Sequence, residues 1–97
     1  MRRATWHKQA KAEADDAFSW HLDRSPGTAA AFMAAVDSAM ATLRSHPQAG
    51  ARIAGDIRRF HVPGYPFIVV YRQTARGIRV LAFANTSRHP GFWTGRR

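Results

Sequence analysis

The sequence contains no cysteine, which excludes disulfide bonds and metal sites built from thiolates. Nothing in it requires an oxidising compartment, so we expect a cytoplasmic protein. No apolar run approaches the ~20 residues that a membrane span needs, and no charged segment followed by an apolar stretch marks a secretion signal. No spacing of histidine and carboxylate side chains resembles a metal site, and we expect neither a metal nor another cofactor.

Acidic side chains are also scarce, and nearly all of them lie in the first half of the chain. Residues 1–43 carry five basic and five acidic side chains and are neutral overall. Residues 44–97 carry ten arginines against the single acid Asp56, which accounts for the whole net charge of +9. These arginines lie in and around short β-type runs. A folded, arginine-bearing sheet attracts polyanions, such as nucleic acid or an acidic protein segment.

The length and composition indicate one globular domain over residues 1–97. The 97 residues include 45% hydrophobic and 11% aromatic side chains, which is enough for a modest core but leaves no room for a second domain.

The apolar spacing predicts two amphipathic helices joined by a short turn. The first extends from about Lys8 to Asp23, and the second from Pro26 to about Ser45. Ser25 suits the N-cap of the second helix, with the proline at its first position. We expect Phe18, Phe32, Met33 and Met40 in the core, and Trp6, Trp20 and His21 at the margin of the apolar stripe.

The remaining segments read mainly as β-strands. A short first strand is expected at residues 2–7, a loop at 48–55, and strands at 57–62, 67–72 and 78–84. The unbroken apolar run at 67–71 predicts that this strand is central. Residues 85–97 are expected to pack back as an irregular turn or a short helix. The predicted order is β-α-α-β-β-β, an α+β fold with a helical hairpin packed on a small antiparallel sheet.

The arginines of the strands form a candidate anion-binding patch. Arg58 and Arg59 are neighbours in one strand, so they should point to opposite faces. Adjacent antiparallel strands bring further arginines close to them. The alternative is that these are edge-strand charges that discourage aggregation. The candidate patch consists of Arg58, Arg59, Arg72, Arg76, Arg79 and Arg88.

The segment from Asn85 to Trp93 contains the most specific motif. Its Arg88-His89 pair is suited to bind a phosphate and to move a proton near neutral pH. Cleavage of RNA needs a base, an acid and cations around the phosphate, and His61 and His89 are the candidate proton carriers. The simpler interpretation is that His89 is an exposed turn residue and that Trp93 is a core residue.

Taken in order along some 85 residues, several short motifs resemble the RelE/ParE superfamily of type II toxin–antitoxin toxins. The first two are Ala10–Ala14, in the opening of the first predicted helix, and Ala30-Ala31-Phe32, at the start of the second. The longer motifs are Leu43-Arg44-Ser45-His46-Pro47-Gln48-Ala49-Gly50, Ile57-Arg58-Arg59-Phe60, Tyr65-Pro66-Phe67-Ile68-Val69-Val70-Tyr71-Arg72, Ile78-Arg79-Val80-Leu81-Ala82 and Ser87-Arg88-His89-Pro90-Gly91-Phe92-Trp93.

The resemblance implies the β-α-α-β-β-β fold and a toxin neutralised by a cognate antitoxin with an acidic C-terminal segment, in a toxin–antitoxin hetero-oligomer. RelE-like members cleave mRNA on the ribosome with basic residues and often a tyrosine or histidine near the C-terminus, whereas ParE-like members poison DNA gyrase. Here no lysine follows Lys11 and no tyrosine follows Tyr71. The ending Arg88-x-Pro90-x-x-Trp93 resembles the ParE side.

The leading hypothesis is therefore a toxin that inhibits DNA gyrase by protein–protein contact, without catalysis of its own. The alternative is a ribosome-dependent mRNA endonuclease, and a third possibility is a basic nucleic-acid-binding module that lacks base-reading motifs. The residues expected to bind antitoxin or target are Arg58, Arg59, Arg72, Arg79, Arg88 and Trp93. The catalytic candidates of the nuclease hypothesis are Arg58, Arg79, Arg88, His61 and His89.

Overall fold

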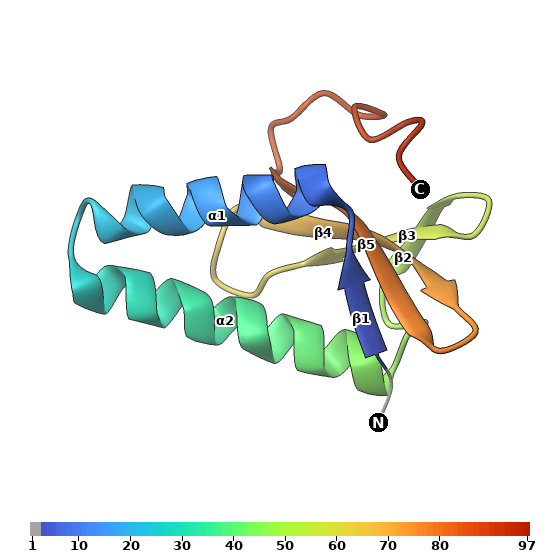
Figure 1. Ribbon diagram of the computed structural model, residues 1–97, viewed down its shortest axis with the longest axis horizontal. Helices are drawn as coiled ribbons and strands as arrows, with labels where there is room; N and C mark the ends of the chain where they lie inside the picture. Colours follow the sequence, from blue (N-terminus) through green and yellow to red (C-terminus); the bar gives the residue numbers. More distant parts are fainter. Residues whose placement is uncertain (1–2) are drawn as a thin grey trace.

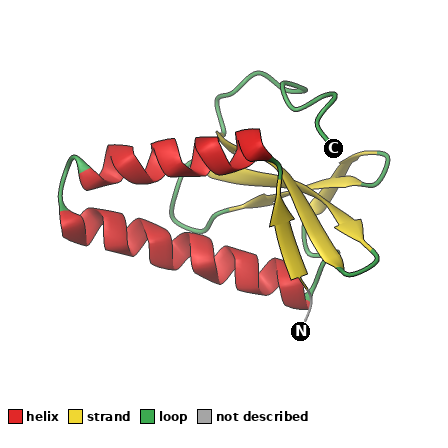
Figure 2. Ribbon diagram, in the orientation of Figure 1, coloured by secondary structure: helices red, strands yellow, loops and turns green. Residues whose placement is uncertain are grey.

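The computed structural model describes residues 3–97, which form two helices and five strands (Figure 1). The expected α+β order is confirmed, and the helical hairpin packs on one side of the sheet (Figure 2). Arg2, which the sequence places in the first strand, lies outside the described residues. The elements are β1 (Arg3–Trp6), α1 (Lys8–Leu22), α2 (Pro26–Ser45), β2 (Ala51–Ala54), β3 (Ile57–His61), β4 (Phe67–Thr74) and β5 (Gly77–Asn85).

Both helices begin at residues that cap them. His7 Nδ1 accepts a hydrogen bond from the Gln9 amide at 3.0 Å, and Ser25 Oγ accepts one from the Thr28 amide at 3.0 Å. Each side chain pairs a backbone donor that the first turn of a helix leaves without a partner. The helix bounds therefore agree with the predicted ones to within one residue.

The sheet has the strand order β1-β5-β4-β3-β2, so β4 is central, as predicted. The sequence predicts an antiparallel sheet, and the structure corrects this at one position, because β1 pairs with β5 in parallel. Both helices and three strands separate these two strands, so no hairpin turn sets their relative direction. The sheet is therefore mixed.

A second correction concerns residues 48–55, which the sequence predicts as a loop. Ala51–Ala54 form the edge strand β2, which pairs with β3 through Ala51 and Arg59, and through Arg52 and Arg58. All four residues of β2 are exposed. An exposed strand has no alternation of apolar and polar residues, and this explains why the sequence pattern does not reveal it.

The two sides of the sheet carry different apolar clusters. On the helix side, Phe32, Tyr71 and Phe83 belong to the main core. On the opposite side, which we call the distal side, Val70 and Leu81 belong to a smaller cluster that Phe92 and Trp93 partly cover. Residues 86–97, which we call the C-terminal segment, thus pack back on the sheet as expected. They contain turns and no regular helix.

Two core assignments change. The side chain of Met33, expected in the core, is 37% exposed, whereas His21, expected at the margin, is only 6% exposed. The His21 ring stacks on Phe32 at 4.1 Å between centroids and fills part of the hairpin interior. Neither helix of residues 3–97 combines the length and the apolarity needed to cross a membrane.

Candidate partner-binding surfaces

Strand alternation places two of the predicted arginines side by side on the distal side of the sheet. Arg72 of β4 pairs with Arg79 of β5, and Thr5 of β1 and Ile57 of β3 flank the pair. Like charges directly opposite each other destabilise a sheet. The arrangement therefore places two guanidinium groups where an anion would relieve their repulsion.

The hydrogen bonds of these two arginines are incomplete. Arg79 donates from Nε and Nη2 to the main-chain oxygen of Arg97, both at 3.3 Å. Arg72 Nε is buried and has no hydrogen-bond partner among the described residues. A buried donor without a partner costs about 1–3 kcal/mol, which an incoming acceptor would offset.

Arg58 and Arg59 point to opposite sides, as their adjacency predicts. Arg58 pairs with Tyr71 across the strands and donates from Nη1 to the Gly50 carbonyl at 2.9 Å. Arg59 pairs with Val70, a distal-side residue, and is exposed. Arg58 therefore supports the loop that follows α2, and Arg59 is free to contact a partner.

The same loop is bound by the Tyr71 hydroxyl, which sequence analysis does not single out. The hydroxyl donates to the Pro47 carbonyl at 2.8 Å and accepts from the Gly50 amide at 2.9 Å. Burial raises the pKa of Tyr71, although the Gly50 hydrogen bond and the Arg58 charge act in the opposite direction. Gly50 is required here because an added Cβ would lie 2.6 Å from the Arg59 carbonyl and 2.7 Å from the Tyr71 hydroxyl.

Glu13 is a second residue that the sequence analysis does not identify. Its carboxylate accepts the Phe83 amide at 3.1 Å and binds Arg96 through two hydrogen bonds of 2.8 and 3.1 Å. Arg96 also donates to the Leu81 carbonyl at 3.1 Å. The pair thus satisfies backbone groups of β5 beyond the end of β1. Glu13 is the only glutamate of the chain, but a partner 83 residues away leaves no local pattern.

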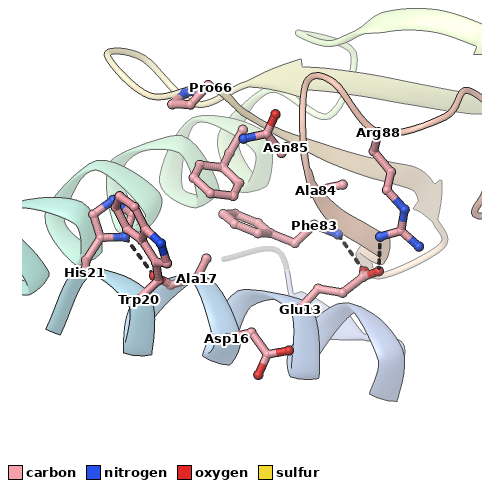
Figure 3. Close-up of a pocket in the computed structure, with 11 residues that line it drawn as sticks. Glu13, Asp16, Ala17, Trp20, His21, Pro66, Phe83, Ala84, Asn85 and Arg88 are labelled. Carbon is pink, nitrogen blue, oxygen red and sulfur yellow. Dashed lines mark hydrogen bonds and ion pairs between the residues drawn. The ribbon is translucent and has the colours of Figure 1, made fainter. Parts of the chain in front are cut away.

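The predicted Arg88-His89 pair lies in the exposed part of the C-terminal segment. Arg88 approaches Glu13 at 3.5 Å (Figure 3). Its guanidinium also lies over the Phe92 ring, at 4.3 Å from the ring centroid. His89 is exposed, and Trp93 packs against the distal cluster. The exposed position of His89 fits the simpler interpretation of the segment, whereas Trp93 is only partly buried and is not a residue of the core.

A groove opens between α1 and the ends of β4 and β5, next to Glu13 (Figure 3). Its volume is about 580 Å³. Trp20 lies at its rim with 53% of its surface exposed, and Arg24 covers one face of the indole at 3.2 Å from the centroid. Most of its lining is apolar, and its charged members are Glu13, Asp16 and Arg88. The further lining residues are Ala17, His21, Pro66, Phe67, Phe83, Ala84 and Asn85.

The structure does not gather the five catalytic candidates of the nuclease hypothesis. Arg58 lies on the helix side, whereas Arg79 and His61 lie on the distal side. The positions of His61 and Arg79 are separated by four residues along β4, which corresponds to about 13 Å. One phosphate does not span that distance. Among the described residues, no group of three or more histidine and carboxylate side chains is placed to hold a metal ion.

Comparison with known proteins identifies the family. The family model described as "ParE toxin of type II toxin-antitoxin system, parDE" matches residues 4–90, most of the chain. The chain belongs to the ParE toxin family. This agrees with the resemblance of its motifs to the RelE/ParE superfamily, and with the ParE-like ending at Trp93.

A solved ParE-family neighbour supports the fold. The chain is similar to a structure of the chromosomal ParDE toxin–antitoxin system from P. aeruginosa, with a TM-score of 0.73 and 18% sequence identity. The match covers 88% of this chain and 96% of the other. No curated protein sequence matches the chain.

Proposed function

We propose that this ParE-family toxin inhibits DNA gyrase by direct contact and that a cognate antitoxin neutralises it. The observation that carries the proposal is the dispersal of the acid/base candidates, together with family membership. A protein without an assembled proton-transfer site acts most simply by binding. Its contact surface would be the distal arginines and the C-terminal segment.

The residues divide by role within this proposal. Arg59, Arg72 and Arg79 offer charge on the distal side, and Arg88 offers it beside the groove. Trp93 supports the C-terminal segment from beneath, and Arg58 positions the loop after α2. An antitoxin with an acidic, partly apolar segment has a complementary surface in the groove at Trp20, which Arg88 helps to line.

The test is a supercoiling assay with purified toxin, DNA gyrase, ATP and relaxed plasmid. We expect loss of supercoiling and a trapped cleavage complex, with the effect weakened in Arg59→Gln. Arg52→Gln is the matched control, because Arg52 is an exposed arginine of the neighbouring strand outside the proposed contact set. Unimpaired supercoiling without a trapped complex would overturn the proposal.

One observation favours the alternative of a ribosome-dependent mRNA endonuclease. Arg59 and His61 lie two residues apart on the same side of β3, and both line a hollow of about 420 Å³ that also includes Thr86. A cation and a proton carrier therefore share one cavity. This alternative predicts cuts in mRNA on translating ribosomes that disappear in His61→Ala, and intact message would reject it.

A further inference from the structure

Four arginines and two threonines gather at the end of the distal side where β1, β5 and β4 meet. Arg3 of β1 and Thr74 of β4 both pair with Gly77 of β5, one row beyond the Arg72–Arg79 pair. Gly77 contributes no side chain to this row, and an added Cβ would lie 1.8 Å from the Arg3 carbonyl. We name this surface the arginine corner. It consists of Arg3, Thr5, Arg72, Thr74, Arg76 and Arg79.

The corner is a hollow with unbalanced positive charge. A cavity of about 340 Å³ is lined by four of the corner residues, Arg3, Thr5, Thr74 and Arg76, together with Ala75 and Ile78, whereas Arg72 and Arg79 belong to the neighbouring row and do not line it. The three ion pairs of the described residues involve Lys11, Arg88 and Arg96, so no corner arginine is paired with an aspartate or glutamate, and Arg79 alone contacts the main-chain oxygen of Arg97. Asp56 is the one acidic residue of positions 44–97. It directly precedes Ile57, the β3 residue that pairs with Arg72 of β4.

We propose that the arginine corner binds the phosphodiester backbone of duplex DNA. Guanidinium groups donate paired N–H bonds that match phosphate oxygens, and threonine hydroxyls are common further donors to phosphate. The Nε of Arg72, which is buried and has no hydrogen-bond partner among the described residues, lies one row from this cavity. The contact is independent of base sequence, because the corner is built from groups that neutralise phosphates.

Two other polyanions fit the corner less well. An acidic peptide that folds on binding needs apolar anchors, but the exposed large apolar side chains lie elsewhere, at Trp20, Leu22, Met33 and Ile53. Single-stranded nucleic acid needs aromatic rings on which its bases stack. None of the six corner residues is aromatic, and Trp93 packs against the distal cluster. A duplex presents phosphates without requiring either feature.

The inference does not depend on gyrase as the target, and its test therefore uses DNA alone. Binding of the full chain to a 30-base-pair duplex is measured by fluorescence anisotropy across a series of salt concentrations. We expect weak affinity at physiological salt, with a dissociation constant of roughly 10⁻⁴–10⁻⁶ M, and a slope of log K against log[salt] of about −0.9 for each phosphate contact.

A charge-matched pair of variants locates the contact. Arg76→Gln/Arg79→Gln removes two corner charges, and we expect it to reduce the magnitude of the slope by about 1.8. Arg24→Gln/Arg52→Gln removes the same net charge from residues outside the corner, and we expect the slope to stay unchanged. Circular dichroism checks that each variant is folded. If the corner double variant does not fold, the single substitution Arg76→Gln, at an exposed hairpin position, replaces it in the comparison.

The proposal is overturned if both double variants weaken binding equally, because the contact is then only net charge. It is also overturned if single-stranded RNA of equal length binds as tightly as the duplex, or if polyglutamate of equal charge displaces the duplex as efficiently as unlabelled DNA does. Because Arg79 also belongs to the proposed gyrase contact, the two sites are separated with Arg76→Gln alone: weakened duplex binding with gyrase inhibition retained supports the corner as a separate site. The reverse result overturns the corner and leaves the gyrase proposal intact.

Discussion

Side-chain hydrogen bonds from the sheet hold the loop that follows α2. Tyr71 makes two buried hydrogen bonds to this loop, and Arg58 adds a third to Gly50. Residues 47–50 would otherwise expose backbone groups between the end of the helix and the edge strand. The tyrosine thus links α2 to the centre of the sheet over 21 and 24 residues of sequence.

We predict that Tyr71→Phe destabilises the protein by about 1–3 kcal/mol, because the Gly50 amide and the Pro47 carbonyl lose a buried partner. The free energy of unfolding is measured by urea titration at pH 7. Tyr65→Phe is the control, since it removes the other tyrosine hydroxyl of the chain. A loss no larger than in this control would show that the hydrogen bonds carry little net stability.

The raised pKa of Tyr71 also predicts a dependence on alkaline pH. The neutral hydroxyl is favoured in the folded state, so its contribution is complete below the ordinary tyrosine pKa of 10.0 and is lost as pH rises through the higher folded value. The difference in unfolding free energy between wild type and Tyr71→Phe should therefore shrink above pH 10. A constant difference between pH 7 and pH 11 would contradict this.

At the scale of elements, the C-terminal segment is held by charge at one point and by apolar contact at another. Glu13 binds Arg96 and Arg88 at the edge of β5, while Phe92 and Trp93 rest on the distal cluster. The Glu13 and Arg96 side chains are only 17% and 11% exposed. Poorly solvated pairs of this kind cost more to break than exposed ones do.

Glu13→Gln tests this attachment. We expect a loss of about 1–3 kcal/mol and faster amide exchange at Phe83, because the amide side chain cannot bind the Arg96 guanidinium at two oxygens. Lys11→Gln is the control, since it breaks the exposed Lys11–Asp15 pair and should cost less than about 0.5 kcal/mol. Equal effects of the two substitutions would mean that Glu13 does not anchor the C-terminal segment.

The elements also show how far sequence reasoning extends. Periodic apolar residues define both helices, and the unbroken run of β4 identifies the central strand, because burial leaves a local pattern. The edge strand β2 and the parallel pairing of β1 with β5 leave none. Met33 follows the helical period of α2, but the sheet and α1 cover only part of that stripe.

The candidate sites divide in the same way. The arginine patch is foreseen because strand alternation and charge are both visible in the sequence. The sequence predicts which arginines lie on opposite sides of the sheet only for the neighbours Arg58 and Arg59. The Glu13–Arg96 pair and the groove at Trp20 arise only when segments distant in sequence meet.

Over the described residues, most of the exposed large apolar side chains lie away from the arginine corner, and Ile53 of β2 is the one that belongs to the sheet. Trp20, Leu22 and Met33 are exposed on the helical hairpin, whereas Arg72, Arg76 and Arg79 lie at the far end of the sheet. The neutral half of the chain forms the hairpin, and the arginine-rich half forms most of the sheet. Two partners of different chemistry therefore find separate surfaces on one small domain.

This separation predicts a double dissociation between two binding reactions. Trp20→Ala should weaken binding of the co-expressed antitoxin at least tenfold, because an exposed aromatic beside an apolar groove has the properties of an interface anchor, while duplex DNA binding stays unchanged. Arg76→Gln/Arg79→Gln should lower DNA binding and its salt slope with a smaller effect on the antitoxin. Both affinities are measured on the same preparations, by calorimetry and by anisotropy. If each variant weakens both partners to the same extent, the two surfaces act as one, and the division of the molecule into an apolar and a cationic end has no functional meaning.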